Sequence, residues 1–203
     1  MSDRIETVIR NAASADGTDV DAAAKRLTER AAREELLDVA YAIVDAPVGE
    51  LLVASTPRGL VRISFGAEYG EHVLEELAED VSPRILEAPE RLDTERRQLD
   101  AYFDGKLHDF DLPLDWRLSG GFRAKVLHQI ARIPYGETRS YKEMAEDAGS
   151  PRAFRAAGSA CGSNPIPIVV PCHRVLASGG KLGGYGGGLP AKKYLLRLEG
   201  VLE

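Results

Sequence analysis

The sequence predicts an α/β (α+β) protein, with a small α/β domain at residues 38–116 and a mostly helical domain at residues 117–203. Short segments rich in β-branched residues precede residue 66, whereas apolar residues recur at helical spacing beyond residue 120. Residues 1–116 hold 13 Lys/Arg and 26 Asp/Glu (net −13), and residues 117–203 hold 13 and 6 (net +7), which sum to the formal −6. The second domain is therefore the one suited to a polyanion, although ordinary solvated faces are charged too.

The first domain is predicted to open with three short strands, at residues 39–45, 50–56 and 60–65. Segments containing Pro and Gly separate them at 47–49 and 57–59, and these suit tight turns. The strands supply the β part of the small α/β unit.

Helical patterns near residues 68–80 and 90–104 follow the strands, and a loop around residues 112–116 ends the domain. Residues 1–37 look like an appendage, with opposite charges at helical spacing but only a thin apolar stripe. We expect a solvated helix with a flexible start there, and assign it no purpose.

The second domain is predicted to begin with a helix whose apolar residues recur between residues 122 and 133 and which must stop at Pro134. Ser140 and Glu143 then form a capping box that opens a short helix ending near Gly149.

Ser150 and Pro151 predict the start of the next helix, with Ser as the N-cap and Pro at the first helical position. This helix carries Arg155. Two short helices joined by a Gly-containing turn, the second basic, are typical of a helix-turn-helix, although two packed helices give the same pattern. Because residues 156–163 are almost all small, they favour close contact with DNA by shape over readout of base edges.

No apolar run approaches the roughly 20 residues that span a bilayer, and the N-terminus lacks the features of a signal peptide. We therefore expect a cytoplasmic protein with no membrane partner. A disulfide is not expected in a reducing compartment, and two thiols without nearby His pairs do not make a zinc site. The two cysteines, Cys161 and Cys172, must then be explained by packing or by chemistry, and we interpret Cys161 as packing.

Cys172 follows a proline-rich run at residues 164–171 that holds the chain rigidly, and His173 and Arg174 come directly after it. A thiol is a weak nucleophile until it ionises, and an imidazole or a positive field promotes the thiolate. A lone Cys-His pair is more often a buried structural Cys beside a surface His. Both interpretations stay open on these residues alone.

Residues 179–188 contain seven glycines and one aromatic residue, Tyr185. The spacing matches neither a Rossmann fingerprint nor a P-loop. Bare backbone N–H groups and one ring are the parts needed to clamp a planar base. The alternative, a flexible linker, is disfavoured by the apolar helix that follows at residues 191–199.

These segments together resemble the O6-alkylguanine-DNA alkyltransferases, also called methylated-DNA–protein-cysteine methyltransferases. The resemblance extends over residues 38–203 and rests on five stretches in order: 133–141, Arg155 with its small-residue helix, 164–175, 184–187 and 195–200. It implies a ribonuclease-H-like first domain and a winged-helix-like second domain with a helix-turn-helix.

The resemblance implies DNA repair by direct transfer of an alkyl group from O6-alkylguanine in double-stranded DNA to Cys172. The damaged base is flipped out of the helix, and each protein molecule acts once. Activity on O4-alkylthymine and cooperative binding along DNA are left open. The family further implies a monomer and no cofactor, and the lack of cysteines in the first domain predicts no metal site.

The resemblance also implies residue roles. Cys172 is the nucleophile, coupled through water to His173, which Glu199 orients, while Asn164 braces the turn that carries the thiol. The residues assigned to substrate binding are Tyr141, Val175, Tyr185, Gly186 and Lys192.

Arg155 is assigned to fill the gap in the base stack. Tyr141 is assigned to rotate the nucleotide, and Ser150 and Ser178 to contact phosphate.

Three rival functions fit the sequence less well. A binding protein that senses alkyl lesions without catalysis is disfavoured by the presence of Cys172. A Cys-His hydrolase is disfavoured by the single base beside the nucleophile and by the basic helix. A helix-turn-helix transcription factor leaves the Cys-His and glycine-rich segments unexplained.

Overall fold

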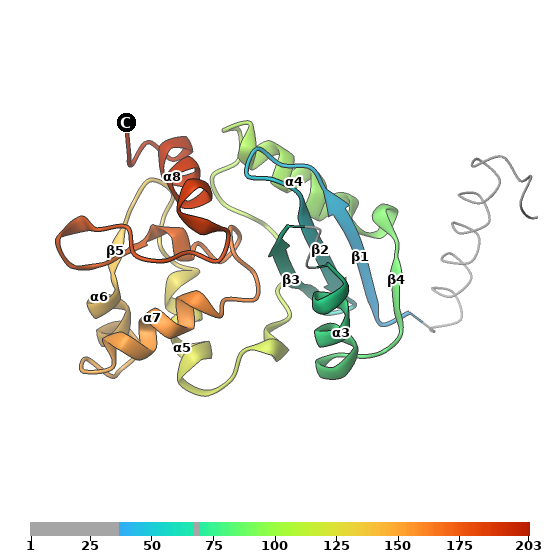
Figure 1. Cartoon of the computed structure of the whole chain (residues 1–203), viewed down its shortest axis with the longest axis horizontal. Helices are drawn as coiled ribbons and strands as arrows, with labels where there is room; N and C mark the ends of the chain where they lie inside the picture. The colour runs from blue at the N-terminus through green and yellow to red at the C-terminus, as the bar shows by residue number, and fades with distance from the viewer. Residues whose placement is uncertain (1–36, 67–69) are drawn as a thin grey trace, which may run out of the picture.

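The computed structural model describes residues 37–66 and 70–203, which form two units side by side (Figure 1). The helix expected within residues 1–37 falls outside the described residues, apart from Leu37. In the described part of the chain, no helix is long and apolar enough to cross a membrane.

The first unit is built on a four-stranded sheet with the strand order β3-β2-β1-β4. β1 (Val39–Val44), β2 (Leu51–Thr56) and β3 (Gly59–Phe65) pair as antiparallel neighbours, which confirms the three predicted strands. β4 (Ile85–Glu87) runs parallel to β1. Sequence analysis missed β4 because three residues are too few to display an alternating pattern.

Two helices accompany the sheet, α3 (Gly70–Asp80) and α4 (Asp93–Phe103). The single helix expected near residues 90–104 is in fact preceded by a separate 3-10 turn, η2 (Pro89–Leu92). The Arg91 N–H donates to the Ala88 carbonyl at 3.0 Å, a bond between residues three apart that makes the first turn tighter than α.

Both faces of the sheet are covered, and β2 shows how. Leu51 and Val53 join the core that contains α4, whereas Leu52 and Ala54 pack with α3 on the opposite face. Alternation along a strand sends neighbouring side chains to opposite faces. This explains why the first five residues of β2 are all buried.

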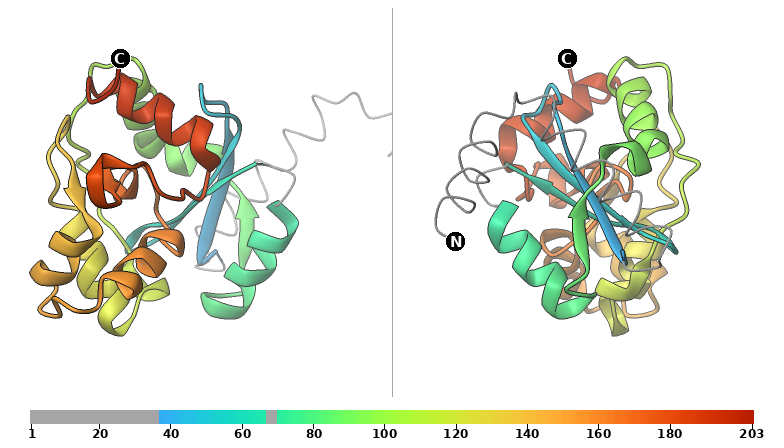
Figure 2. Two further views of the ribbon diagram at one scale, coloured as in Figure 1. Left: turned by 60° about the vertical axis from the view of Figure 1, so that its left-hand side comes forward. Right: turned by 90° about the vertical axis from the view of Figure 1, so that its right-hand side faces the viewer.

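The second unit is mostly helical, and its helices, coloured yellow to red, lie beside the sheet of the first unit (Figure 2). Its α-helices are α5 (Gly121–Ile130), α6 (Tyr141–Asp147), α7 (Phe154–Gly162) and α8 (Gly188–Leu198). Short elements complete it: η3 (Trp116–Leu118), η4 (Cys172–Arg174), η5 (Ser178–Gly180), and the parallel pair β5 (Arg139–Ser140) and β6 (Val175–Leu176). The predicted α/β class is confirmed.

α6 and α7 form the helix-turn-helix pair. The predicted capping box is present, since Ser140 accepts from the Glu143 N–H at 3.2 Å and Glu143 accepts from the Ser140 N–H at 2.7 Å.

The predicted start of α7 was wrong. α7 begins at Phe154, and its N-cap Ala153 gives no side-chain cap. Ser150 instead completes the end of α6, where its N–H donates to the Ala145 carbonyl at 2.8 Å beyond Gly149 at φ +78°. Ser150 is therefore part of a C-terminal closure of the preceding helix, and Pro151 lies in the turn.

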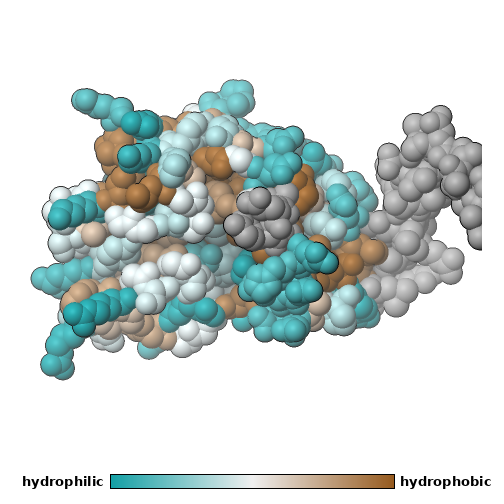
Figure 3. All heavy atoms as spheres, in the orientation of Figure 1, coloured by the Kyte–Doolittle hydropathy of each residue, from teal (hydrophilic) through white to brown (hydrophobic). Residues whose placement is uncertain are grey.

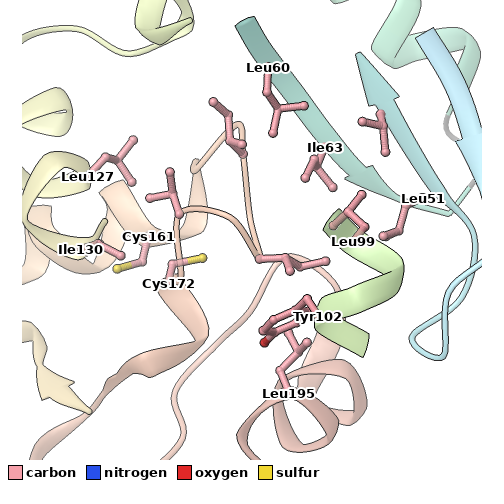
Figure 4. Packing of buried hydrophobic residues seen from close by; sticks show 14 of the residues in the cluster. Leu51, Leu60, Ile63, Leu99, Tyr102, Leu127, Ile130, Cys161, Cys172 and Leu195 are labelled. Carbon is pink, nitrogen blue, oxygen red and sulfur yellow. The ribbon is translucent and has the colours of Figure 1, made fainter. Parts of the chain in front are cut away.

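One hydrophobic core runs through both units. Figure 4 shows residues of β3 and α4 packed towards α8 and α5, with Cys161 and Cys172 in the same cluster. The segment between the units also pairs with the sheet, because the Leu60 N–H donates to the Pro113 carbonyl at 2.9 Å. The sheet thus supports the helical unit directly.

Gly59→Ala tests this junction. At φ +128° a Cβ on residue 59 would lie 2.1 Å from the Pro113 carbonyl oxygen. We expect the free energy of unfolding, measured in urea, to fall by about 3 kcal/mol or more, because strain and a backbone clash add.

Gly49→Ala is the matched control, since Gly49 has φ +99° and a Cβ added there would meet nothing within 4 Å. It should cost only strain, about 1 kcal/mol. Equal losses in the two variants would rule out the clash with Pro113.

Candidate functional site

The loop before Cys172 is fixed by hydrogen bonds from its own side chains. Asn164 Nδ2 donates to the Val170 carbonyl at 2.8 Å, and Asn164 Oδ1 accepts from the Ile166 N–H at 3.1 Å. The Cys172 N–H donates to the same Val170 carbonyl at 2.8 Å. The bracing predicted for Asn164 therefore has a geometric basis.

The same loop carries backbone strain and a contact with the sheet. Ile168 has φ +75° although it is β-branched, a conformation that costs about 1–3 kcal/mol and persists only where its surroundings impose it. The Ile63 N–H of β3 donates to the Pro165 carbonyl at 2.8 Å. The first domain therefore helps to hold the loop that presents the thiol.

Glu199 is the centre of a buried hydrogen-bond network at the end of α8. Its Oε1 accepts from Tyr102 Oη at 2.7 Å, from His173 Nε2 at 2.9 Å and from Arg174 Nη2 at 2.9 Å. Its Oε2 accepts from Arg174 Nε at 2.9 Å and from the Gly136 N–H at 3.4 Å. The contact between Glu199 and His173 was predicted, whereas those with Tyr102 and Arg174 were not.

This network sets the charges of its members. Burial by itself raises the pKa of Glu199, but the hydrogen bonds and charges of His173 and Arg174 outweigh burial and lower that pKa to about 2. Burial lowers the pKa of His173, despite the opposing bond from Glu199. The imidazole is therefore neutral near pH 7, and it donates from Nε2 because an ionised carboxylate can only accept.

The other ring nitrogen of His173 is left with a lone pair. Nδ1 is buried and has no hydrogen-bond partner within the described part of the chain. A neutral imidazole held at Nε2 by a carboxylate can accept a proton at Nδ1. The geometry supplies a general base in the residue next to Cys172.

Cys172 is only 4% exposed, and burial raises the pKa of its thiol to about 11, although the Asn164 side chain and the Lys192 charge lower it. Lys192 is fully buried and donates to the carbonyls of Val175, at 2.8 Å, and Leu182. The resting thiol is therefore protonated, and the promoted thiolate expected from the neighbouring residues is not the resting form.

The glycine-rich segment is held by an aromatic side chain of the first domain. The Phe65 ring meets the Tyr185 ring edge-on at 5.5 Å, and Tyr185 in turn lies 6.2 Å from the His173 ring. A Cβ on Gly187 would lie 2.7 Å from the Phe65 ring. Gly187 is therefore required by this packing, whereas Gly186 beside it is exposed and a Cβ added there would meet nothing within 4 Å.

A pocket of about 410 Å³ opens between α6, α7 and η5. Tyr141, Arg155 and Ser178 line it, three residues assigned from the resemblance. Tyr141 also reaches the glycine-rich segment, because a Cβ on Gly183 would lie 2.8 Å from Tyr141 Oη. Ser150 does not line this pocket, in agreement with its place at the end of α6.

The structure also accounts for Cys161 and for the residues that sequence reasoning missed. Cys161 is buried on α7, and burial raises the pKa of its thiol to about 12, which fits a packing role. Tyr102 and Phe65 support the site from outside the motifs, and Arg174 supports it from within the Cys172 stretch without having been assigned a role. The only sequence signal for Arg174 was its position directly after the Cys-His pair, and nothing near Tyr102 pointed to a residue 97 positions away.

Over residues 37–66 and 70–203, no group of three or more His, Cys, Asp or Glu side chains could hold a metal ion. The chemistry available at the site is that of a thiol beside a neutral imidazole, close to a helix-turn-helix. These features define a class of protein: one that binds nucleic acid and reacts through a cysteine of its own.

Comparison with known proteins identifies the family. Residues 39–116 match the 6-O-methylguanine DNA methyltransferase ribonuclease-like domain, and residues 121–201 match the DNA-binding domain of the same family. The chain belongs to this family. It is a methylated-DNA–protein-cysteine methyltransferase, a DNA-repair enzyme with a DNA-binding second domain.

Curated relatives and solved structures agree. The Methanosarcina barkeri methylated-DNA–protein-cysteine methyltransferase is 43% identical over 159 residues, which is 78% of this chain and 96% of that protein. The Mycolicibacterium paratuberculosis protein of the same name is 44% identical over 161 residues, which is 79% of this chain and 92% of that protein. A crystal structure of the Mycobacterium tuberculosis protein in complex with DNA has a TM-score of 0.67 and 41% identity, covering 79% of this chain and 92% of that one.

The pH dependence of stability tests the Glu199 network. Because the pKa of Glu199 is lowered from 4.5 to about 2, its contribution is present above pH 4.5 and is lost as the pH falls towards 2. The loss should reach about 3 kcal/mol at pH 2, where Glu199 is protonated in the unfolded chain but only about half protonated in the folded one. Urea unfolding between pH 6 and pH 2 measures it.

Glu199→Gln should be less stable at pH 6, by about 3–5 kcal/mol, because Arg174 stays buried without a counter-charge. It should also lose part of the pH slope below pH 4.5. Glu76→Gln removes an exposed carboxylate that pairs with Arg62 and should keep the wild-type slope. An unchanged slope in Glu199→Gln would contradict the lowered pKa.

Proposed function

We propose that the alkyl group of O6-alkylguanine in double-stranded DNA is transferred to Cys172. The observation that carries the proposal is the Glu199–His173 bond of 2.9 Å, which commits Nε2 and leaves Nδ1 as the basic nitrogen in the residue adjoining the thiol. Without that bond the buried Cys-His pair would equally suit a structural role.

His173 activates the thiol. The pKa of Cys172, about 11, keeps the sulfur protonated and inert until a substrate is bound. A water between Sγ and Nδ1 then carries the proton to the imidazole, and Glu199 stabilises the imidazolium that forms. The buried Lys192 ammonium stabilises the thiolate, because its charge lowers the pKa of Cys172.

The transfer is a single displacement. The thiolate attacks the alkyl carbon, an S–C bond forms as the bond from carbon to O6 breaks, and the electron pair stays on the guanine. The guanine takes up a proton, so the thiol proton ends on the base overall. The product is S-alkylcysteine, a thioether that is not readily cleaved, and each protein molecule acts once.

The damaged base must leave the stack to reach a thiol that is only 4% exposed. Tyr141 rotates the nucleotide, and Arg155 fills the gap and donates hydrogen bonds to the unpaired partner base. Tyr185, the Gly186 N–H and the Val175 carbonyl then hold the flipped guanine. The Val175 carbonyl accepts from Lys192 at 2.8 Å and retains a second lone pair for the base.

Phosphate contact is proposed for Ser178, which is exposed at the pocket mouth. Phosphate contact by Ser150 has less support, because that proposal placed Ser150 at the N-terminus of α7, and the N-cap of α7 lies three residues further on, at Ala153. We place the reaction in the cytoplasm, where a free thiol stays reduced, with a monomer on double-stranded DNA and no cofactor.

The acceptor is tested with an oligonucleotide duplex that carries O6-methylguanine. Mass spectrometry should find one added methyl group, on the peptide that contains Cys172, and the reaction should stop at about one equivalent because the thioether is not turned over. Cys172→Ser should give no adduct, and Cys161→Ala should still give one. A methyl group on Cys161, or turnover beyond one equivalent, would refute the proposal.

The role of Arg155 is tested by comparing two substrates. In Arg155→Ala the rate on duplex DNA should fall about 10–100-fold more than the rate on free O6-benzylguanine, because charged hydrogen bonds to the unpaired base are lost. Arg197→Ala removes the same charge from an exposed position on α8 and serves as the control. Equal losses on both substrates would contradict the role in base flipping.

A further inference from the structure

Phe154 is a large apolar side chain left in water at the first position of α7. It is 47% exposed, although α7 is otherwise built almost entirely of small residues. In Figure 3 the corner that holds α6 and α7 shows weakly hydrophobic surface bordered by strongly hydrophilic, protruding side chains. A single exposed apolar residue is ordinary on a protein surface, so the case for Phe154 rests on the residues around it.

The Phe154 ring lines the pocket that also contains Tyr141 and Arg155, two residues assigned to base flipping under the proposed function. Phe154, Arg155 and Tyr141 line the same cavity of about 410 Å³. The surface of the cavity is mostly apolar, although four of its seven lining residues carry a polar group: Tyr141, Lys142, Arg155 and Ser178. A ligand that combines planar apolar faces with phosphate fits this surface, and duplex DNA has both.

Phe154 and Arg155 also touch each other. The Arg155 guanidinium lies over the Phe154 ring, 5.6 Å from its centre. No hydrogen bond or ion pair of the Arg155 side chain is found within the described residues, so this cation–π contact is what positions it. The two consecutive residues therefore form one unit, a flat apolar group beside a flat charged one.

We propose that Phe154 is a second inserted side chain, which enters the base stack next to the nucleotide that the enzyme flips. The proposal rests on the proposed function and adds to it. Arg155 donates hydrogen bonds to the unpaired base. Phe154 stacks on a base at the neighbouring step, where stacking between bases has been lost.

Insertion of Phe154 would offset the free-energy cost of unstacking the bases. Unstacking a base step costs a few kcal/mol, and proteins that bend DNA meet this cost with an apolar wedge such as Phe or Leu. Inserting Phe154 removes an exposed ring from water and supplies a stacking partner for a base. Its position in the first turn of a helix fixes the angle at which the wedge enters.

Three variants of residue 154 separate a wedge from a mere support for Arg155. Phe154→Leu keeps an apolar wedge but removes the cation–π contact, Phe154→Ala removes both, and Phe154→Trp keeps both. Ile43→Ala is the control, because Ile43 is an exposed apolar residue, 38% accessible, on a strand of the first domain.

Each protein is assayed for the rate of methyl transfer from duplex DNA and the rate with free O6-benzylguanine. A duplex with 2-aminopurine beside the lesion reports unstacking of that step by fluorescence. For Phe154→Ala we expect the rate on duplex DNA to fall about tenfold more than the rate on the free base, equivalent to about 1.4 kcal/mol of lost stacking, with a weaker fluorescence rise.

Phe154→Leu and Phe154→Trp should retain most of both signals, and Ile43→Ala all of them. If Phe154→Leu loses as much as Phe154→Ala, the ring serves only to position Arg155 and the wedge is refuted. A wild-type fluorescence response in Phe154→Ala would refute it as well. Failure of the wild type to methylate Cys172 would instead overturn the proposed function, so the two failures are distinguishable.

Discussion

The site depends on a single buried carboxylate. Glu199 is 5% exposed, and an isolated charge at such a position is expensive to bury. It is tolerated because Tyr102, His173 and Arg174 all donate to it. The donors come from two segments, α4 and η4, and Glu199 itself follows α8, so satisfying one carboxylate fixes three pieces of backbone relative to one another. Removing it would leave the Arg174 charge buried and uncompensated, which costs more than the loss of one hydrogen bond.

The first domain contributes two side chains and a backbone hydrogen bond to this site. Tyr102 and Phe65 reach into the helical unit, one to the carboxylate and one to the glycine-rich segment, and the Ile63 N–H holds the strained loop at the Pro165 carbonyl. The acidic character of that domain is compatible with DNA binding because the family's DNA-binding domain is the second one, residues 121–201. The charge that faces a phosphate backbone belongs to the second domain.

Sequence analysis reached the first three strands and the capping box because each has a local pattern, whereas the expected contact between Glu199 and His173 came from the family resemblance. It misplaced the start of α7, because a Ser-Pro pair after Gly149 suits a helix start as well as a helix end, and only the bond to the Ala145 carbonyl decides between them. It could not find Tyr102, since a tyrosine in an amphipathic helix looks like any core residue. Nor could it give the pKa of Cys172, because burial is a property of the folded chain.

The position of Glu199 late in the sequence has a consequence for biosynthesis. A chain leaves the ribosome from its N-terminus, and the first domain can fold while the second is still being made. His173 and Arg174 then emerge before the carboxylate that joins them to Tyr102, across 97 positions of chain. The imidazole gains its orientation only when residue 199 arrives. The buried hydrogen-bond network around Glu199 can therefore close only when nearly all of the second domain has been synthesised.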